Sequence, residues 1–359
     1  MKIRIFQPIV PEYRVALFEG LAVRFAGKID LVAAEAIGDD RSYPLRAMPY
    51  DYAHPFKRVG PFLWQSGLSL KGLARGDVVV VCGDVHQLSS LWIALCAKLR
   101  RIKVVWWGHH KTATSTGLST KIRLAMAKVL SDVMLTYTES GRRYLMAHGF
   151  KAERVFATGN TVDQEPIKAA IARYDGHDPY KGRPGLLCCS VLRAKVRLDL
   201  AIRALADERL SMVVLAVIGE GPMREEYGRV AKETGVEDRL IWVGATHDQE
   251  VMAPWFLSAK AFVYPGSVGL SILHAMSYGL PVVVHDNPEH QMPEYEIMVD
   301  GKTGLCFKEG DVRSLADKIA GLLANPSRWK EMSATAQTMA FEKYSMAKMI
   351  DNFATALTA

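Results

Sequence analysis

The sequence lacks several features that define common classes of protein. Its five cysteines form no Cys-x-x-Cys pair and lie mostly in apolar runs, so we expect reduced core residues rather than a disulfide framework. No uninterrupted apolar stretch is long enough to span a bilayer. The first residues, MKIRIFQPIVPEYR, have no long apolar segment after their charges, which predicts a strand rather than a signal peptide. We therefore expect a protein of a reducing compartment, cytosolic or bound to a membrane surface.

Several catalytic motifs are also missing. The chain has no Gly-x-x-x-x-Gly-Lys phosphate loop, no Gly-x-Gly-x-x-Gly after its first strand and no His-Glu-x-x-His. The segment from Gly269 to Leu273 contains a serine but lacks the second glycine of a nucleophile elbow, which argues against a serine hydrolase. No Asp-x-Asp pair offers two carboxylates to a divalent metal. We expect neither a metal site nor a cofactor.

The net charge of +7 is unevenly distributed along the chain. Residues 1–165 contain 23 Lys and Arg against 14 Asp and Glu, a net charge of +9, and the remaining 22 basic and 24 acidic residues give −2. Such a basic first half predicts an anionic partner, either a membrane surface or a phosphorylated acceptor. Nucleic acid is a weaker candidate, because no nucleic-acid-binding motif accompanies the charge.

Short apolar runs rich in β-branched residues alternate with helix-like segments throughout the chain. This pattern predicts parallel sheets covered by helices on both faces. The predicted strands of the first half are 3–6, 29–33, 78–82, 104–107, 133–138 and 155–158, and those of the second are 186–190, 212–218, 240–243, 261–264, 282–285 and 304–307. Glycine and proline accumulate in 164–185, where the hydrophobic period is lost. We therefore predict an α/β protein with two doubly wound domains, 1–165 and 166–339, and a C-terminal helix over 340–359 that packs back on the first.

The strongest chemical signal is the string from Tyr264 to Val284. It reads as a strand, a loop with Gly266 and Gly269, a helix, a glycine stop and then Pro281 before another strand. Glycines allow a ligand close to the backbone, and the amino end of the helix offers unpaired N–H groups to a phosphate. An ordinary tight turn is the alternative, but the whole ordered string favours a diphosphate-binding loop.

This string resembles the donor-binding element of the family 4 glycosyltransferases, which are retaining enzymes of the GT-B fold. The family carries a loop of the type Glu-Gly-Phe-Gly-Leu, a helix with a second Glu, and then Gly-x-Pro-Val. The segments 11–18, 159–163, 217–222 and 296–304 follow in the family's order, so the resemblance covers nearly the whole chain. It implies two facing Rossmann-like domains separated by an interdomain cleft, with an acceptor-binding first domain and a second domain that binds a UDP- or GDP-sugar.

The two glutamates of the family motif map here to Gly266 and His274. In the family, the first glutamate faces the donor sugar and the second commonly holds the ribose hydroxyls. A histidine can make one such hydrogen bond but not the paired contacts of a carboxylate. The resemblance assigns donor binding to Arg197, Gly219, Glu220, Gly221, Gly266, Ser267, Val268, Gly269, Leu270, Ser271 and His274.

The basic segment after the first strand of the second half occupies the place of the family's diphosphate-binding Arg and Lys. It runs Ser190-Val-Leu-Arg193-Ala-Lys195-Val-Arg197-Leu-Asp199. Sugar transfer leaves negative charge on the departing diphosphate, and fixed cations stabilise that charge. We therefore predict catalytic roles for Arg193 and Lys195, with a solvated helix face as the alternative.

In the first half, the strand ending at Trp107 is followed by Gly108, His109, His110 and Lys111. The family often places a histidine there, near the donor sugar and the acceptor. His109 is our predicted catalytic histidine, able to hydrogen-bond the sugar or to move a proton. His86 is the second candidate, and a purely structural role for these histidines is nearly as well supported.

The segment from Phe62 to Arg75 mixes aromatic, aliphatic and basic residues. It could be a membrane-interfacial segment. The preferred interpretation is a helix that packs on the sheet with its cations in water. Lys98, Arg100, Arg101 and Lys103 add positive charge close by in the sequence. Attachment to the inner face of the cytoplasmic membrane therefore stays open.

The resemblance predicts a metal-independent enzyme that moves a sugar from a nucleotide diphosphate sugar to a glycan or a polyprenyl-diphosphate-linked acceptor. Its expected setting is the synthesis of cell-surface polysaccharide or glycoconjugate. Two alternatives remain at this point. The loss of both glutamates is compatible with a non-catalytic nucleotide-sugar-binding protein, and the same architecture also serves nucleotide-sugar epimerases.

Overall fold

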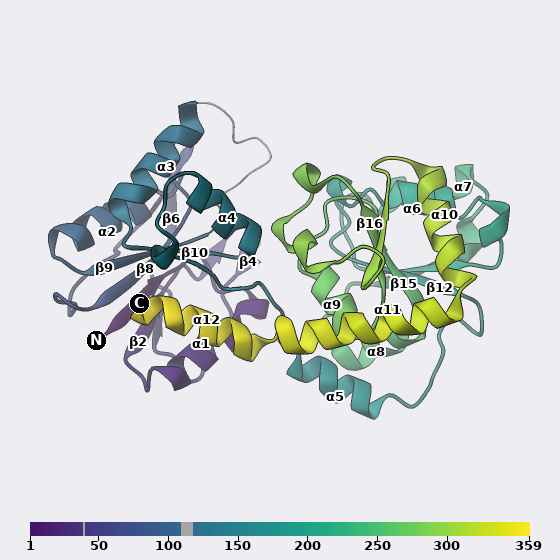
Figure 1. The fold of residues 1–359 in the computed structure, drawn as a ribbon, viewed down its shortest axis with the longest axis horizontal. Coiled ribbons are helices and arrows are strands. Elements are labelled where there is room, and N and C mark those ends of the chain that lie inside the picture. Colours follow the sequence, from purple (N-terminus) through teal and green to yellow (C-terminus); the bar gives the residue numbers. More distant parts are fainter. Residues whose placement is uncertain (39, 109–117) are drawn as a thin grey trace. The chain divides into compact units, whose positions relative to one another are not determined.

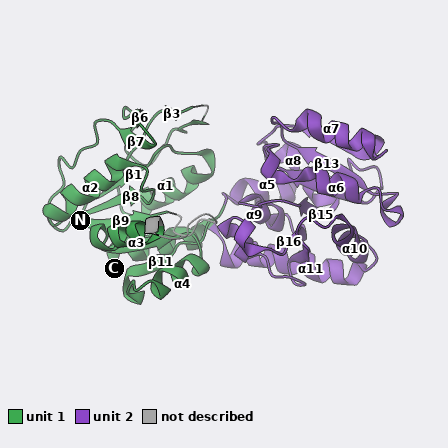
Figure 2. Cartoon of the chain, turned by 90° about the horizontal axis from the view of Figure 1, so that it is seen from above, with its two compact units in different colours: residues 1–161, 346–359 green, residues 162–345 purple. Residues whose placement is uncertain are grey.

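The computed structural model describes residues 1–38, 40–108 and 118–359. The chain forms two compact units, shown in Figure 1 by sequence and in Figure 2 by unit. Unit 1 contains residues 1–161 and 346–359, and unit 2 contains residues 162–345. Each unit has its own sheet and its own buried core.

Unit 1 is built on a seven-stranded sheet in which all neighbouring strands are parallel. Its order is β11-β10-β9-β8-β1-β2-β5, so the chain winds outward in both directions from β1 and β8. The strands are β1 (Ile3–Phe6), β2 (Ile29–Val32), β5 (Tyr50–Asp51), β8 (Val78–Cys82), β9 (Lys103–Trp107), β10 (Val133–Thr136) and β11 (Val155–Ala157). The predicted parallel sheet is confirmed, with β5 as an edge strand that the sequence pattern did not reveal.

The central strand β8 shows how this sheet separates two apolar layers. Val78 and Val80 point into one layer, and Val79 and Val81 point into the other. Successive side chains of a strand face opposite sides, so an unbroken valine run fits a sheet covered on both faces. Helices α1 (Glu12–Arg24) and α12 (Met346–Thr358) cover the first face, and α2 (Leu88–Leu99), α3 (Leu118–Leu130) and α4 (Glu139–Ala147) cover the second.

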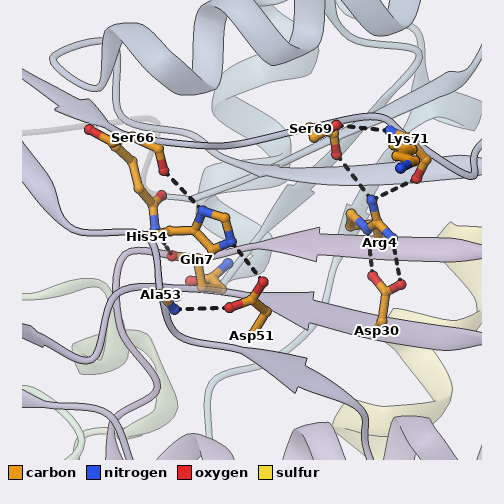
Figure 3. Close-up of polar contacts among 10 residues, drawn as sticks. Arg4, Gln7, Asp30, Asp51, Ala53, His54, Ser66, Ser69 and Lys71 are labelled. Atoms are coloured by element: carbon orange, nitrogen blue, oxygen red, sulfur yellow. Dashed lines mark hydrogen bonds and ion pairs between the residues drawn. The ribbon is translucent and has the colours of Figure 1, made fainter.

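Polar contacts hold the long connection between β2 and β8 against the sheet (Figure 3). Arg4 makes a paired contact with Asp30 through Nε at 2.7 Å and Nη2 at 2.9 Å, and its Nη1 donates to the carbonyls of Ser69 and Lys71. His54 bridges Asp51 and the carbonyl of Ser66, at 3.0 and 2.9 Å. These contacts tie residues 51–71 to the edge and surface of the sheet.

Two short antiparallel hairpins lie in this connection. They are β3 (Ala36–Ile37) with β4 (Asp40–Arg41), and β6 (Phe56–Val59) with β7 (Phe62–Gln65). The preferred helix over Phe62–Arg75 was therefore wrong. Residues 62–65 pair with 56–59, and the rest of the segment forms turns with positive φ at Gly67 and Gly72, a conformation that breaks a helix.

Unit 2 is built on a six-stranded parallel sheet with the order β14-β13-β12-β15-β16-β17. Numbered along the chain, this is the 3-2-1-4-5-6 order of a dinucleotide-binding fold. The strands are β12 (Gly185–Cys189), β13 (Val214–Ile218), β14 (Leu240–Gly244), β15 (Ala259–Tyr264), β16 (Val282–His285) and β17 (Gly304–Phe307). The prediction of two doubly wound sheets is thus confirmed for this unit as well.

Seven α-helices of unit 2 pack around this sheet, within the residues that the structure describes. Helix α6 contacts α7 and α10, whereas α8 contacts α5 and α9 contacts α11. Their bounds are α5 (Glu165–Arg173), α6 (Leu198–Ala204), α7 (Arg224–Glu233), α8 (Gln249–Ser258), α9 (Ser271–Ser277), α10 (Val312–Leu323) and α11 (Pro326–Thr338).

The C-terminal residues divide differently from the prediction of one helix over 340–359. Helix α11 continues into the π-type turn η7 (Met339–Lys343) within unit 2, and α12 then begins at Met346 in unit 1. Buried Gln164 explains the division, because its Nε2 donates to the carbonyls of Ala340 at 3.0 Å and Tyr344 at 3.2 Å. Residues 162–165 and 340–345 are thereby held together in unit 2.

None of the helices in the described residues combines the length and the apolar composition that a membrane crossing requires.

Candidate donor site

The sheet of unit 2 has a topological switch between β12 and β15. The two strands are neighbours, and the chain continues from them toward opposite edges of the sheet. Loops that leave the carboxyl ends of two such strands diverge and leave room for a ligand between them. Here the loops are residues 190–197 after β12 and 265–270 after β15. Most of the predicted donor-binding residues lie in these two loops.

The two loops touch at Lys195 and Gly266. The N–H of Ser267 donates to the carbonyl of Lys195 at 3.1 Å. A Cβ added to Gly266 would lie 1.9 Å from that same carbonyl oxygen. No side chain fits there, so glycine is required by the approach of the other loop. The position of the family's first glutamate is therefore filled by backbone.

A third loop, the predicted Gly219-Glu220-Gly221, joins the same cluster after β13. A Cβ on Gly219 would lie 1.9 Å from the carbonyl oxygen of Ser190, and both glycines have positive φ, 138° and 157°. The N–H of Leu192 donates to the carbonyl of Glu220 at 2.9 Å. The three loops thus form one backbone-packed unit, which we call the loop cluster (residues 190–197, 219–221 and 265–271).

The predicted cations of the loop cluster differ in their partners. Arg197 forms an ion pair with Asp199 at 3.2 Å, and the hydrogen bond to this carboxylate raises the pKa of Arg197. Arg193 and Lys195 are exposed and have no acidic partner among the described residues. The carbonyl of Arg193 is fixed by the hydroxyl of buried Tyr227 at 3.0 Å. Two uncompensated cations therefore lie on a fixed backbone.

The amides of the glycine loop also differ in availability. The N–H of Val268 donates to Oε1 of Gln291 at 2.8 Å, and Nε2 of Gln291 donates to the carbonyl of His285 at 3.1 Å. With Ser267 bonded to Lys195, the first two amides are already used. The N–H groups of Gly269, Leu270 and Ser271 have no acceptor in the described part of the chain. These three amides precede or begin helix α9, and they are the donors available to an anion.

Of the two histidines predicted in unit 1, the structure describes only His86. His109 lies outside the described residues. His86 is exposed and contacts Asp84 through Nδ1 at 2.9 Å. In the described ranges, 1–38, 40–108 and 118–359, no group of three or more His, Cys, Asp or Glu side chains could hold a metal ion.

Arg14 is a buried cation that the sequence analysis did not single out. Its guanidinium lies over the rings of Tyr13, Trp107 and Tyr137 at 5.1, 5.0 and 5.1 Å, and no carboxylate pairs with it among the described residues. The residue spacing in α1 indicated the burial of Arg14. Leu17, Phe18 and Leu21 follow Arg14 by three, four and seven residues, so the four side chains share the buried face of α1.

Comparisons with known proteins agree with this architecture. Residues 175–339 match the family model of the group 1 glycosyl transferases. The GDP-mannose-dependent alpha-(1-6)-phosphatidylinositol monomannoside mannosyltransferase of Mycolicibacterium smegmatis is 28% identical over 288 residues, 72% of this chain and 73% of that protein. The chain is a glycosyltransferase of the GT-B fold.

Two solved structures show the same fold along the chain. HepE of Anabaena in complex with UDP has a TM-score of 0.74 at 15% identity, over 100% of both chains. The apo form of the lipopolysaccharide outer core galactosyltransferase WaaB has a TM-score of 0.72 at 17% identity, over 100% of this chain and 99% of that one. The predicted GT-B fold is thus confirmed.

His274, at the second glutamate position, is held by a network inside unit 2 of the glycosyltransferase. Its Nε2 lies 2.9 Å from Oε1 of Gln249, which also accepts from the hydroxyl of Tyr278 at 2.9 Å. Gln249 is oriented by its Nε2, which donates to the carbonyl of His247 at 3.3 Å. The ring packs 4.8 Å from that of Phe256.

This network determines the protonation of His274. An amide oxygen only accepts, so Nε2 of His274 must carry the proton that it donates. Burial lowers the pKa of His274 to about 4, so the ring is neutral near pH 7. The neutral ring with a proton on Nε2 leaves Nδ1 as an acceptor. The ring can therefore accept one hydrogen bond at Nδ1.

The steric role of Gly266 can be tested by its replacement. Gly266→Ala should lower the free energy of unfolding by about 2 kcal/mol or more, because the new Cβ forces the loops at Lys195 and Gly266 apart. The matched control is Gly321→Ala in α10, where a Cβ meets nothing within 4 Å. That change should be neutral or stabilise by up to about 1 kcal/mol. Urea unfolding of both variants measures the difference, and equal stability would contradict the proposed contact.

The neutral state of His274 predicts a pH dependence of stability. The pKa of His274 is about 4 in the folded chain and near 6.5 when unfolded, so the unfolded state binds the proton first as the pH falls. Folding stability linked to this group is complete above the unfolded pKa and falls below it. Between about pH 7.5 and about pH 5, the wild type should lose roughly 1–2 kcal/mol more than His274→Asn.

Urea titrations of both proteins at the two pH values provide the measurement. Other titrating groups are shared, so their contributions cancel in the comparison. Equal losses in the two proteins would show that His274 takes up its proton in the folded state as readily as in the unfolded one.

Proposed function

We propose that the chain transfers a sugar from a UDP- or GDP-sugar to a hydroxyl of a glycan or lipid-linked acceptor, with retention of the anomeric configuration. The observation that carries this proposal is the loop cluster of unit 2. It combines two exposed cations without acidic partners, Arg193 and Lys195, with three unused amides at Gly269, Leu270 and Ser271. Cations and aligned N–H groups at a switch point suit a diphosphate.

The chemical role of the cluster follows from the leaving group. Breaking the bond between the sugar and the nucleoside diphosphate leaves negative charge on the phosphate. Arg193 and Lys195 would stabilise this charge by charge-assisted hydrogen bonds, and the three amides would add neutral ones. Because the loops pack through backbone, the donors keep their places while the charge develops. This arrangement supports transfer without a metal or an organic cofactor.

The relatives support the choice of donor and acceptor class. The mycobacterial relative is named as GDP-mannose-dependent, and the HepE structure contains UDP. WaaB is named as a galactosyltransferase of the lipopolysaccharide outer core. We infer a role in the synthesis of cell-surface polysaccharide or glycoconjugate, with the sugar and the linkage left open between these classes.

The basic first half supports an anionic acceptor. Residues 1–165 have a net charge of +9, which favours a polyprenyl-diphosphate-linked glycan and attachment to the inner, cytoplasmic face of the membrane. In this proposal unit 1 binds the acceptor, and His109 hydrogen-bonds the sugar or moves the proton of the acceptor hydroxyl.

Neutralising the unpaired cations tests the donor site. Arg193→Gln/Lys195→Gln should weaken the affinity for UDP or GDP roughly a hundredfold or more, since charge-assisted hydrogen bonds to the diphosphate are lost. Isothermal titration calorimetry with UDP, GDP and the corresponding nucleotide sugars gives the affinities and identifies the nucleotide base that the protein prefers. Transfer to acceptor should fall in parallel.

The matched control is Lys232→Gln/Arg313→Gln, which removes two exposed charges from helices α7 and α10 of the same unit. It should leave the affinity within roughly threefold, the size of a surface charge effect. An unchanged nucleotide affinity in the folded Arg193/Lys195 variant would overturn the donor site. Release of an altered nucleotide sugar without acceptor would replace transfer by epimerisation.

A further inference from the structure

Helices α2 and α3 of unit 1 each expose a stripe of apolar side chains. On α2 the stripe is Trp92, Leu95 and Leu99, with exposed fractions of 54%, 42% and 77%. On α3 it is Ile122, Ala125 and Val129, with Ile122 at 51% and Val129 at 72%. Both stripes have the spacing i, i+3, i+7, which places three residues on one side of a helix.

Both stripes point away from the sheet of unit 1. The residues that face the core are Ile93, Ala94 and Ala97 on α2, and Leu124 and Ala127 on α3. At about 100° per residue, these lie roughly opposite the exposed stripes. The two helices pack side by side on the same face of the sheet. The exposed residues therefore form one outward surface, here called the α2–α3 face.

The α2–α3 face carries charge of only one sign. Neither helix contains an aspartate or a glutamate. Lys121 and Lys128 are exposed beside the apolar stripe of α3, and exposed Arg101 follows α2. Lys98 and Arg100 are engaged internally, with Asp132 and with the carbonyls of Leu70 and Leu73. The accessible cations thus lie beside the exposed apolar stripes of the two neighbouring helices.

We propose that the α2–α3 face binds an anionic lipid bilayer, with its apolar stripes at the headgroup boundary and Lys121, Lys128 and Arg101 on the phosphates. This deepens the proposed function, on which it rests, by naming the surface that meets the membrane. Exposed leucines, isoleucine and a tryptophan flanked by cations have the composition of an interfacial surface. A second copy is disfavoured, since a symmetric contact would bring the same cations together.

Vesicle flotation tests the apolar part of the surface. Leu95→Gln/Leu99→Gln keeps helix-compatible residues and should lower the partition onto vesicles of phosphatidylcholine with about one third phosphatidylglycerol by roughly tenfold or more. The matched control is Val23→Gln. Val23 is 77% exposed, as Leu99 is, but belongs to α1 on the opposite face of the sheet. It should bind like the wild type.

The cations and the tryptophan give two further readouts. Lys121→Gln/Lys128→Gln should lower the partition and weaken its salt dependence, whereas Arg24→Gln/Lys28→Gln near the end of α1 should not. The fluorescence difference between wild type and Trp92→Phe isolates Trp92, and it should shift to shorter wavelength on anionic vesicles. If the protein binds the vesicles and the fluorescence of Trp92 does not shift, the proposal is overturned.

UDP and GDP affinity, measured without vesicles, separates this proposal from the proposed function. All variants of the α2–α3 face should keep wild-type nucleotide affinity. If the Leu95/Leu99 variant binds vesicles as the wild type does, the surface assignment fails and the donor site stands. If sedimentation shows that the wild type is a dimer and that the Leu95/Leu99 variant is a monomer, the face binds a second copy and the lipid proposal is overturned.

Discussion

The carbonyl of Lys195 lies directly against the backbone of Gly266 and accepts the N–H of Ser267 at 3.1 Å. This contact joins the loops that leave β12 and β15, the two strands at the topological switch of unit 2. It also holds Arg193 and Lys195 on the same cluster as the unused amides of Gly269 to Ser271. The same approach excludes every side chain at Gly266, so the family's first glutamate has no place here.

The second departure from the family has a different physical character. His274 keeps the helix position but exchanges a charged carboxylate for a neutral ring, since burial lowers the pKa of His274 to about 4. Gln249 and Tyr278 fix the ring and its tautomer. In the proposed donor site, Gly266 and His274 thus stand where the family has two carboxylates, and Arg193 and Lys195 have no acidic partner among the described residues. In that proposal, the lower negative charge favours the diphosphate, and Nδ1 of His274 is the acceptor offered to the ribose.

The sequence predicted the features that depend on local pattern. All twelve predicted strands exist. An apolar run such as Val78–Cys82 must bury the side chains of both its faces, and a strand in a sheet covered by helices on both sides does so. The hairpins β3–β4 and β6–β7 were missed, since the residues of β3, β4 and β6 are largely exposed and show little alternation. The hydrogen bonds from Val268 to Gln291 and from Ser267 to Lys195 join residues that are distant in sequence. A sequence pattern does not reveal such contacts. The spacing in α1 indicates that Arg14 is buried, but it does not reveal that Arg14 lies over three aromatic rings.

The most direct test of the donor site is a crystal structure of the glycosyltransferase with UDP or GDP bound. We expect phosphate oxygens within hydrogen-bond distance of the amides of Gly269, Leu270 and Ser271, and of the side chain of Arg193 or Lys195. We also expect the hydrogen bond from Ser267 to Lys195 to persist. A nucleotide whose phosphates lie away from the loop cluster, or a site that forms only when Lys195 and Gly266 separate, would contradict it.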